Sequence, residues 1–158
     1  TSTITHILLL PLFILVLLGA AQIWQIIATR QSLNVSVYRT ASCLSKYRDI
    51  GLCRDLLETS VMDIGLGDNV GPVRYYRYEN ETDMRLIDES GDITTIQNWF
   101  RSNCGEQFAV EASLTFSRDV IIPFLPARRM TFAERRSSYV DCSPHYGILE
   151  ETPIAPLN

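Results

Sequence analysis

The chain has 158 residues, with 14 basic and 18 acidic side chains that give a formal net charge of −4. This length favours one compact domain, and the mildly negative charge argues against nucleic acid as a partner. The charge is unevenly distributed, because every Asp, Glu, Lys and Arg lies from Arg30 onward. The sequence therefore divides into an uncharged segment, residues 1–29, and a charged remainder, residues 30–158.

The uncharged segment has a length that suits a membrane. As a helix, the stretch from Ile4 to Thr29 measures about 39 Å, whereas the hydrocarbon core of a bilayer is about 30 Å thick. We predict one helix from about Thr3 to about Lys46. Its apolar part, residues 1–29, is expected to lie in lipid or against other apolar helices.

Two features of the apolar helix predict contact with other helices. Pro11 removes one helical hydrogen bond, so a kink or local opening is expected between Ile7 and Pro11. In lipid such a defect persists only where neighbouring helices or polar side chains satisfy the freed backbone groups. Gly19, Ala20 and Ala21 form a small-residue face that lets a second helix approach closely.

The charged remainder begins with a helical stem, residues 30–64. Apolar residues recur there at the spacing of an amphipathic helix. These are Leu33, Val37, Ala41 and Leu44. A second helix is predicted from Leu52 to Ile64, with four apolar residues on its inner side. They are Leu56, Leu57, Val61 and Ile64.

The chain contains four cysteines: Cys43, Cys53, Cys104 and Cys142. This even number fits two disulfides formed in an oxidising compartment. A zinc site is the alternative, but there is no CxxC pair, and the only histidines are His6 and His145. Disulfides are therefore the favoured interpretation, and no metal or other cofactor is expected.

The spacing of Cys43 and Cys53 constrains the two helices. In one straight helix the two residues would lie about 15 Å apart, whereas a disulfide needs Cα atoms within about 7 Å. Either the chain turns near Gly51 and the two bond locally, or each pairs with a distant cysteine. We favour the local bond.

Residues 72–142 are predicted to be rich in strands. The expected strands are Val73–Tyr78, Met84–Asp88, Phe108–Phe116 and Met130–Val140. The third strand alternates, with apolar residues on one face, as in a half-buried strand. They are Phe108, Val110, Ala112, Leu114 and Phe116. If the last two strands form an antiparallel hairpin with Phe116 opposite Met130, Cys104 also falls opposite Cys142, which favours that second disulfide.

Two smaller groups receive a structural interpretation. Aromatic residues such as Tyr75 and Trp99-Phe100 are expected in core and cross-strand packing rather than in surface contacts. Asp88, Glu89 and Asp92 lack the spacing of a calcium-binding loop and are interpreted as an acidic turn. Residues 143–158 are expected to form an extended tail. The predicted fold is α+β: a long apolar helix, a short second helix and a small antiparallel sheet.

The beginning of the chain resembles a known family. Residues Thr1 to Pro11, the apolar run that ends at Gly19, the polar Gln22 and Gln25 and the segment Ala28–Leu33 together are similar to the mature start of TadE-like pseudopilins. The strands around the proline-bearing segment 121–126 are loosely similar to that family's closing hairpin.

The resemblance implies a filament subunit. It implies insertion into the inner membrane, cleavage before Thr1 by a prepilin peptidase, and assembly through apolar helices into an extracellular filament that serves attachment to surfaces. The implied partners are copies of the chain or other pilins, with no small-molecule substrate. Thr5 stands where the family carries glutamate, which is thought to meet the N-terminal amine of a neighbouring subunit. Because Thr5 offers only a neutral hydrogen bond, the Thr1 amine needs a modification, solvent or another partner.

Two other function classes are alternatives to a filament subunit. A membrane-anchored adhesin or assembly factor that never polymerises would carry the same apolar run, although Pro11 and the small-residue face favour helix packing. An enzyme is not expected, because no histidine or lysine lies in a recognisable triad and no motif places a nucleophile at a turn.

Overall fold

The structure is a computed structural model that describes residues 2–62, 71–117 and 129–143. Three helices and a four-stranded antiparallel sheet make up the described part of the chain, so the fold is α+β with a long N-terminal helix, as predicted. The helices are α1 (Ser2–Tyr47), α2 (Ile50–Met62) and α3 (Ile93–Ser102). The strands are β1 (Arg74–Tyr78), β2 (Met84–Leu86), β3 (Gln107–Ser117) and β4 (Arg129–Tyr139).

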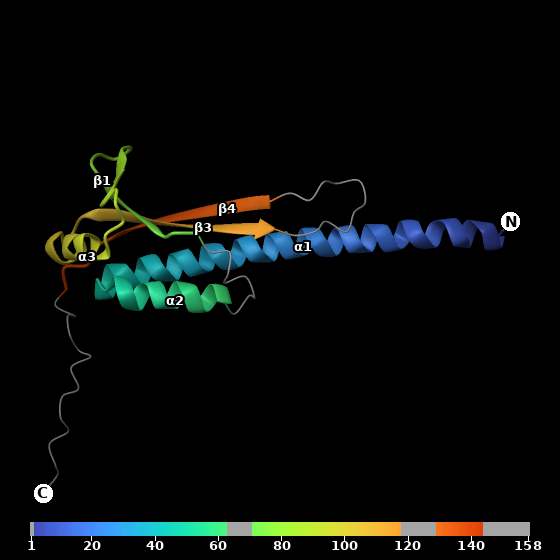
Figure 1. Cartoon of the computed structure of the whole chain (residues 1–158), viewed down its shortest axis with the longest axis horizontal. Coiled ribbons are helices and arrows are strands. Elements are labelled where there is room, and N and C mark those ends of the chain that lie inside the picture. The colour runs from blue at the N-terminus through green and yellow to red at the C-terminus, as the bar shows by residue number, and fades with distance from the viewer. Residues whose placement is uncertain (1, 63–70, 118–128, 144–158) are drawn as a thin grey trace, which may run out of the picture.

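Figure 1 shows α1 as a long rod that extends well beyond the rest of the molecule at its N-terminal end. The other elements form a head around its C-terminal half, with α2 on one side and the β3–β4 hairpin on the other. With 46 residues, α1 is about 69 Å long. It continues without interruption through Pro11, so the chain stays helical where the kink or local opening was predicted.

The chain turns between α1 and α2 at Arg48 and Asp49. Arg48 adopts a left-handed conformation with φ of 53°, and its N–H donates to the carbonyl of Leu44 at 3.1 Å, which closes the last turn of α1. The carboxylate of Asp49 then accepts from the Leu52 N–H at 3.3 Å and caps α2. The turn therefore precedes Gly51, and α2 begins two residues earlier than predicted.

The buried face of α2 differs from the predicted face. Ile50, Cys53 and Leu57 are fully buried, whereas Leu56 is 48% exposed. The earlier start explains the correction, because the face that meets α1 is set by Ile50 and continues at i+3 and i+7. Two further predicted positions, the side chain of Val61 and the whole of Ile64, lie outside the described part of the structure.

The sheet has the strand order β2-β1-β3-β4. In the β3–β4 hairpin, Phe116 pairs with Met130, which is the predicted register. The apolar face of β3 is buried from Phe108 through Leu114 as expected. Ala109 belongs to the opposite face and is also buried. The alternation along β3 had predicted burial for the other face only.

Both favoured disulfides are present. Cys43 and Cys53 have Cα atoms 5.6 Å apart across the α1–α2 turn, and Cys104 and Cys142 have Cα atoms 5.0 Å apart at the open end of the hairpin. All four thiols are therefore oxidised, and none is left to bind zinc.

Helix α3 was not among the predicted elements. Asp92, interpreted as part of an acidic turn, caps this helix by accepting from the backbone N–H groups of Thr94 and Thr95. The first four residues of α3 are β-branched and have weak helix propensity. Ile96 and Phe100, four residues apart, bury the inner face of α3 and stabilise it through tertiary contacts.

The core lies between α1, α2 and the inner face of the sheet. The Phe100 ring makes edge-to-face contacts with Tyr75, Trp99 and Phe108, at centroid distances of 6.2, 5.2 and 4.9 Å. The expected packing of these aromatic residues in the core is confirmed, with Trp99 only partly buried. The stem residues predicted to face inward on α1 are all buried: Leu33, Val37, Ala41 and Leu44.

Candidate functional site

The N-terminal half of α1 carries an uncovered apolar surface. Ile4 is 66% exposed, Phe13 is 61% exposed and Trp24 is 72% exposed. No Asp, Glu, Lys or Arg interrupts this surface before Arg30. Exposed apolar area of this extent on a soluble monomer is rare and marks a surface that other apolar groups cover.

The same helix changes character at Thr29. Thr29 is buried, and its hydroxyl donates to the carbonyl of Gln25 at 2.8 Å. Ser36 and Thr40 bond in the same way to the carbonyls four residues earlier, which lets their hydroxyls enter the head without an unpaired donor. The uncovered surface of α1 therefore ends where the head begins.

The residues predicted for assembly all belong to this uncovered half, as far as the structure describes them. Thr5, Pro11 and Ala20 are exposed, and Gly19 is half-buried. Thr1 lies outside the described residues. None of the described four is buried.

Helix α1 is long and apolar enough to cross a membrane, and within the described residues it is the helix that meets this criterion. An N-terminal signal sequence meets the same criterion of length and composition. A core helix of a soluble protein would be mostly buried, whereas the most apolar window of α1 has no buried residue.

A polar seam fixes the hairpin beside α1 at the start of the head. The Arg30 guanidinium donates to the Glu134 carboxylate at 2.9 Å, and the Arg136 guanidinium donates to the side-chain oxygen of Asn34 at 2.9 and 2.6 Å. A second seam lies at the other end of the head, where the Asp141 N–H donates to the Ser45 carbonyl at 2.9 Å. The hairpin is thus held to α1 at both ends of the stem.

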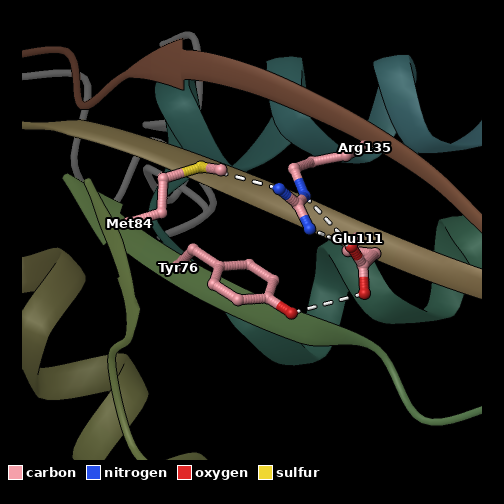
Figure 2. A network of polar contacts seen from close by, with 4 residues as sticks. All are labelled: Tyr76, Met84, Glu111 and Arg135. Carbon is pink, nitrogen blue, oxygen red and sulfur yellow. Dashed lines mark hydrogen bonds and ion pairs between the residues drawn. The ribbon is translucent and has the colours of Figure 1, made fainter. Parts of the chain in front are cut away.

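Figure 2 shows a network on the outer face of the sheet that links all four strands. Arg135 on β4 donates to Glu111 on β3 at 3.0 and 2.5 Å, and Tyr76 on β1 donates to the same carboxylate at 3.3 Å. The Arg135 guanidinium also lies 4.8 Å from the Tyr76 ring centroid and contacts the Met84 sulfur. The hydrogen bond from Arg135 to Glu111 raises the pKa of Arg135 above its usual value. The alternation of residues along a single strand could not indicate this network, because the network depends on the order of the strands in the sheet.

An open cleft of about 510 Å³ lies between α2, β1 and α3. Its lining is mostly apolar and includes the charged side chains of Arg54, Arg74, Asp88 and Glu89 and the buried Tyr75. Burial raises the pKa of Tyr75 to about 12, so this phenol stays protonated at neutral pH. The lining residues include no histidine or cysteine, and the described residues hold no group of three side chains suited to a metal.

Comparison of the chain with protein-family models, with curated proteins and with solved structures finds no match.

Proposed function

We propose that this chain is a structural subunit of a pilin-like filament, held in a membrane by α1 before assembly. One observation supports the proposal above the others. A single continuous helix is apolar and has no buried residue from Ile4 to Ala28, and from Thr29 onward one of its faces is buried in a disulfide-linked head. This division provides an apolar end that avoids water and a head that is folded without help from the apolar end.

The apolar end can be covered by lipid or by identical helices. In lipid its backbone groups are already bonded within the helix. In a bundle of copies, the small residues at Gly19, Ala20 and Ala21 allow close approach, and the heads form an outer wall. A repeated contact between unlike surfaces of identical subunits produces an open helical fibre when its rotation does not close a ring.

The proposed location follows from the same features. Disulfides favour formation outside the reducing cytoplasm, so the head lies on the outer side of an inner membrane and then on an extracellular filament. Attachment to surfaces is the role proposed for that filament, with copies of the chain or other pilins as partners. The role is structural rather than catalytic.

Shearing of cells that express the full chain tests the proposal. The chain should appear as a major component of sheared filaments, and Gly19→Leu should lower the filament yield several-fold without lowering the amount in membranes. Val16→Leu, on the same exposed half of α1, is the matched control and should assemble normally. Strict retention of the wild-type chain in membranes would contradict polymerisation and indicate an anchored, non-polymerising protein.

A further inference from the structure

The chain contains two copies of the pattern Asn-x-Ser/Thr, which is the acceptor pattern for N-linked glycans. The first copy is Asn34-Val35-Ser36, within α1, and the second is Asn80-Glu81-Thr82, between β1 and β2. The pattern alone arises often by chance, so the surroundings of each copy decide whether its asparagine can be modified. Because the pattern requires a hydroxyl as well as an amide, a transferase must reach both side chains together.

The copy in α1 is closed to a transferase. The Asn34 side-chain oxygen accepts hydrogen bonds from the Arg136 guanidinium at 2.9 and 2.6 Å. Ser36 is 4% exposed, and its hydroxyl donates to the Ser32 carbonyl at 2.8 Å. Residues two apart on a helix lie about 200° apart around its axis, so one enzyme surface cannot meet both groups. Asn34 is therefore not an acceptor once the head has folded.

The copy between β1 and β2 forms the tip of a hairpin. The last strand pair is Tyr78 with Met84, and beyond it the Glu79 N–H donates to the Asp83 carbonyl at 2.9 Å. This bond encloses residues 80–82, and all three are exposed. Figure 1 shows the hairpin projecting from the head on the side away from α1. The whole acceptor pattern is thus presented to solvent in one short loop.

The two groups that a transferase needs are available in this loop. Within the part of the chain that the structure describes, the amide of Asn80 and the hydroxyl of Thr82 make no hydrogen bond that would have to break first. The contrast with Asn34 and Ser36 is therefore one of structure, since the two copies satisfy the same pattern.

A tyrosine ring precedes the loop where the first sugar can meet it. Tyr78 lies two residues before Asn80, and the Glu79–Asp83 bond continues the register of β1 and β2. Residues 78 and 80 therefore leave the ribbon on the same side. Tyr78 is half-buried, so part of its ring stays open. The C–H groups of a sugar carry a small positive charge and rest favourably on the negative face of an aromatic ring.

We infer that Asn80 is the acceptor of an N-linked glycan, which a membrane-bound transferase adds from a polyprenyl-linked oligosaccharide. The Asn80 side-chain nitrogen bonds to the anomeric carbon of the first sugar. The bond from that carbon to the phosphate oxygen of the carrier breaks, its electron pair stays on the phosphate, and the nitrogen gives up one proton to the transferase. No group is oxidised or reduced. The inference rests on the part of the proposed function that places the head outside the cytoplasm, but not on filament assembly.

Mass analysis of the full chain, purified in detergent from the cells that naturally produce it, tests the inference. Trypsin, which cleaves after arginine, releases residues 31–39 with Asn34 and residues 78–85 with Asn80 as separate peptides. Fragmentation that keeps side-chain attachments intact then locates the sugar. We expect the glycan on peptide 78–85 and an unmodified peptide 31–39. Asn80→Gln should remove the glycan from the intact chain.

Variants at Thr82 and Tyr78 test the two supporting groups. Thr82→Ser keeps the hydroxyl and should remain glycosylated, whereas Thr82→Val keeps the shape without the hydroxyl and should lose the glycan. Tyr78→Phe should match the wild-type occupancy, and Tyr78→Thr should lower it several-fold. A glycosylated Thr82→Val would overturn the acceptor assignment. Equal occupancy in the two Tyr78 variants would overturn the role of the ring.

The disulfides, measured in the same spectra, report separately on the proposed location. An unmodified Asn80 in a chain with both disulfides formed would overturn the inference and leave the proposed function intact. An unmodified Asn80 in a chain with free thiols would overturn both. A glycan on both asparagines would show that modification precedes folding, which contradicts selection of Asn80 by the folded head.

Discussion

The side chain of Gln97 connects α3 to the turn between α1 and α2. Its oxygen accepts from the Ile50 N–H at 2.8 Å, and its amide nitrogen donates to the Arg48 carbonyl. Ile50 is buried, with 1% exposure, so its N–H depends on this partner for its hydrogen bond. One amide group thereby satisfies two backbone groups at the point where the long helix ends.

Gln97→Ala should lower the free energy of unfolding of the head by about 1–3 kcal/mol, which is the range for leaving a buried donor unsatisfied. Urea unfolding of the full chain in mild detergent, followed by Trp99 fluorescence in a Trp24→Phe background, measures the change. Asn98→Ala, one residue later and exposed, is the matched control and should be nearly neutral. Equal unfolding midpoints for the two variants would show that Gln97 does not hold the turn.

Asp92 links the stability of α3 to pH. The side-chain hydrogen bond from Thr95, followed by the Thr95 backbone N–H, lowers the pKa of Asp92 below its ordinary value of 3.8. A carboxylate whose pKa is lower in the folded state binds its proton more tightly when unfolded. Its stabilising contribution is therefore complete well above pH 3.8 and is lost as the pH falls through the lowered folded pKa.

Asp92→Asn should keep the cap and remove this part of the acid sensitivity, because the amide oxygen still accepts hydrogen bonds but does not titrate. Asp92→Ala should destabilise α3 at every pH. Unfolding midpoints between pH 7 and pH 2, with Trp99 emission as the probe of α3, compare the three proteins. The pKa of Asp88 is also lowered, chiefly by its bond with Ser90, so some acid sensitivity should persist in Asp92→Asn. A full wild-type pH dependence in that variant would rule out Asp92 as a contributor.

At the scale of elements, the two disulfides have different surroundings. Cys43 and Cys53 are buried where α1 turns into α2, at 6% and 0% exposure. Cys104 and Cys142 are both exposed at the open end of the β3–β4 hairpin. A reductant must reach a sulfur atom to attack it, so burial protects the helical link and leaves the hairpin link accessible.

Mild reduction of the native chain should therefore break Cys104–Cys142 before Cys43–Cys53. Alkylation at successive times, followed by mass analysis of the peptides, identifies which thiols are released first. Under denaturing conditions the difference should disappear, since burial no longer protects either bond. Simultaneous release under native conditions would indicate that the α1–α2 turn opens as readily as the hairpin end.

At the scale of the whole molecule, the boundary at Thr29 separates a rod from a folded head. No residue from Ile4 to Ala28 is buried, whereas Leu33 and Val37 on the same helix are. The buried core of the head thus includes residues of the α1 stem and none of the apolar half, whose exposed surface instead governs how the complete molecule behaves in water.

A chain that begins at Thr29 should consequently be a folded monomer in buffer, with both disulfides, while the full chain needs detergent or lipid. Circular dichroism measures whether each chain is folded, and light scattering measures whether it is monomeric. A chain that begins at Tyr38 is the control, because it also loses Leu33 and Val37, which each stabilise by about 1.5–3 kcal/mol on burial. It should be largely unfolded. Aggregation of the chain that begins at Thr29 would show that the apolar half shields part of the head.

The sequence by itself determined the features that depend on local pattern. The uncharged run defined the exposed apolar half of α1, because a helix without charged side chains avoids water. The candidate assembly residues lie in this run. The alternation of β3, together with the position of Met130, determined the register of the hairpin and so the Cys104–Cys142 bond. In both cases a period or a spacing within one segment fixes which side chains share a face.

Only the tertiary structure decided α3, the strand order, the Gln97 contacts and the Glu111–Arg135–Tyr76 network. Helix α3 starts with β-branched residues that disfavour a helix alone, and burial of Ile96 and Phe100 outweighs that preference. The placement of β4 beside α1 was likewise set by the Arg30–Glu134 and Asn34–Arg136 contacts, which join residues about a hundred positions apart. Such contacts depend on which elements meet in space, and no periodicity within a single element records that.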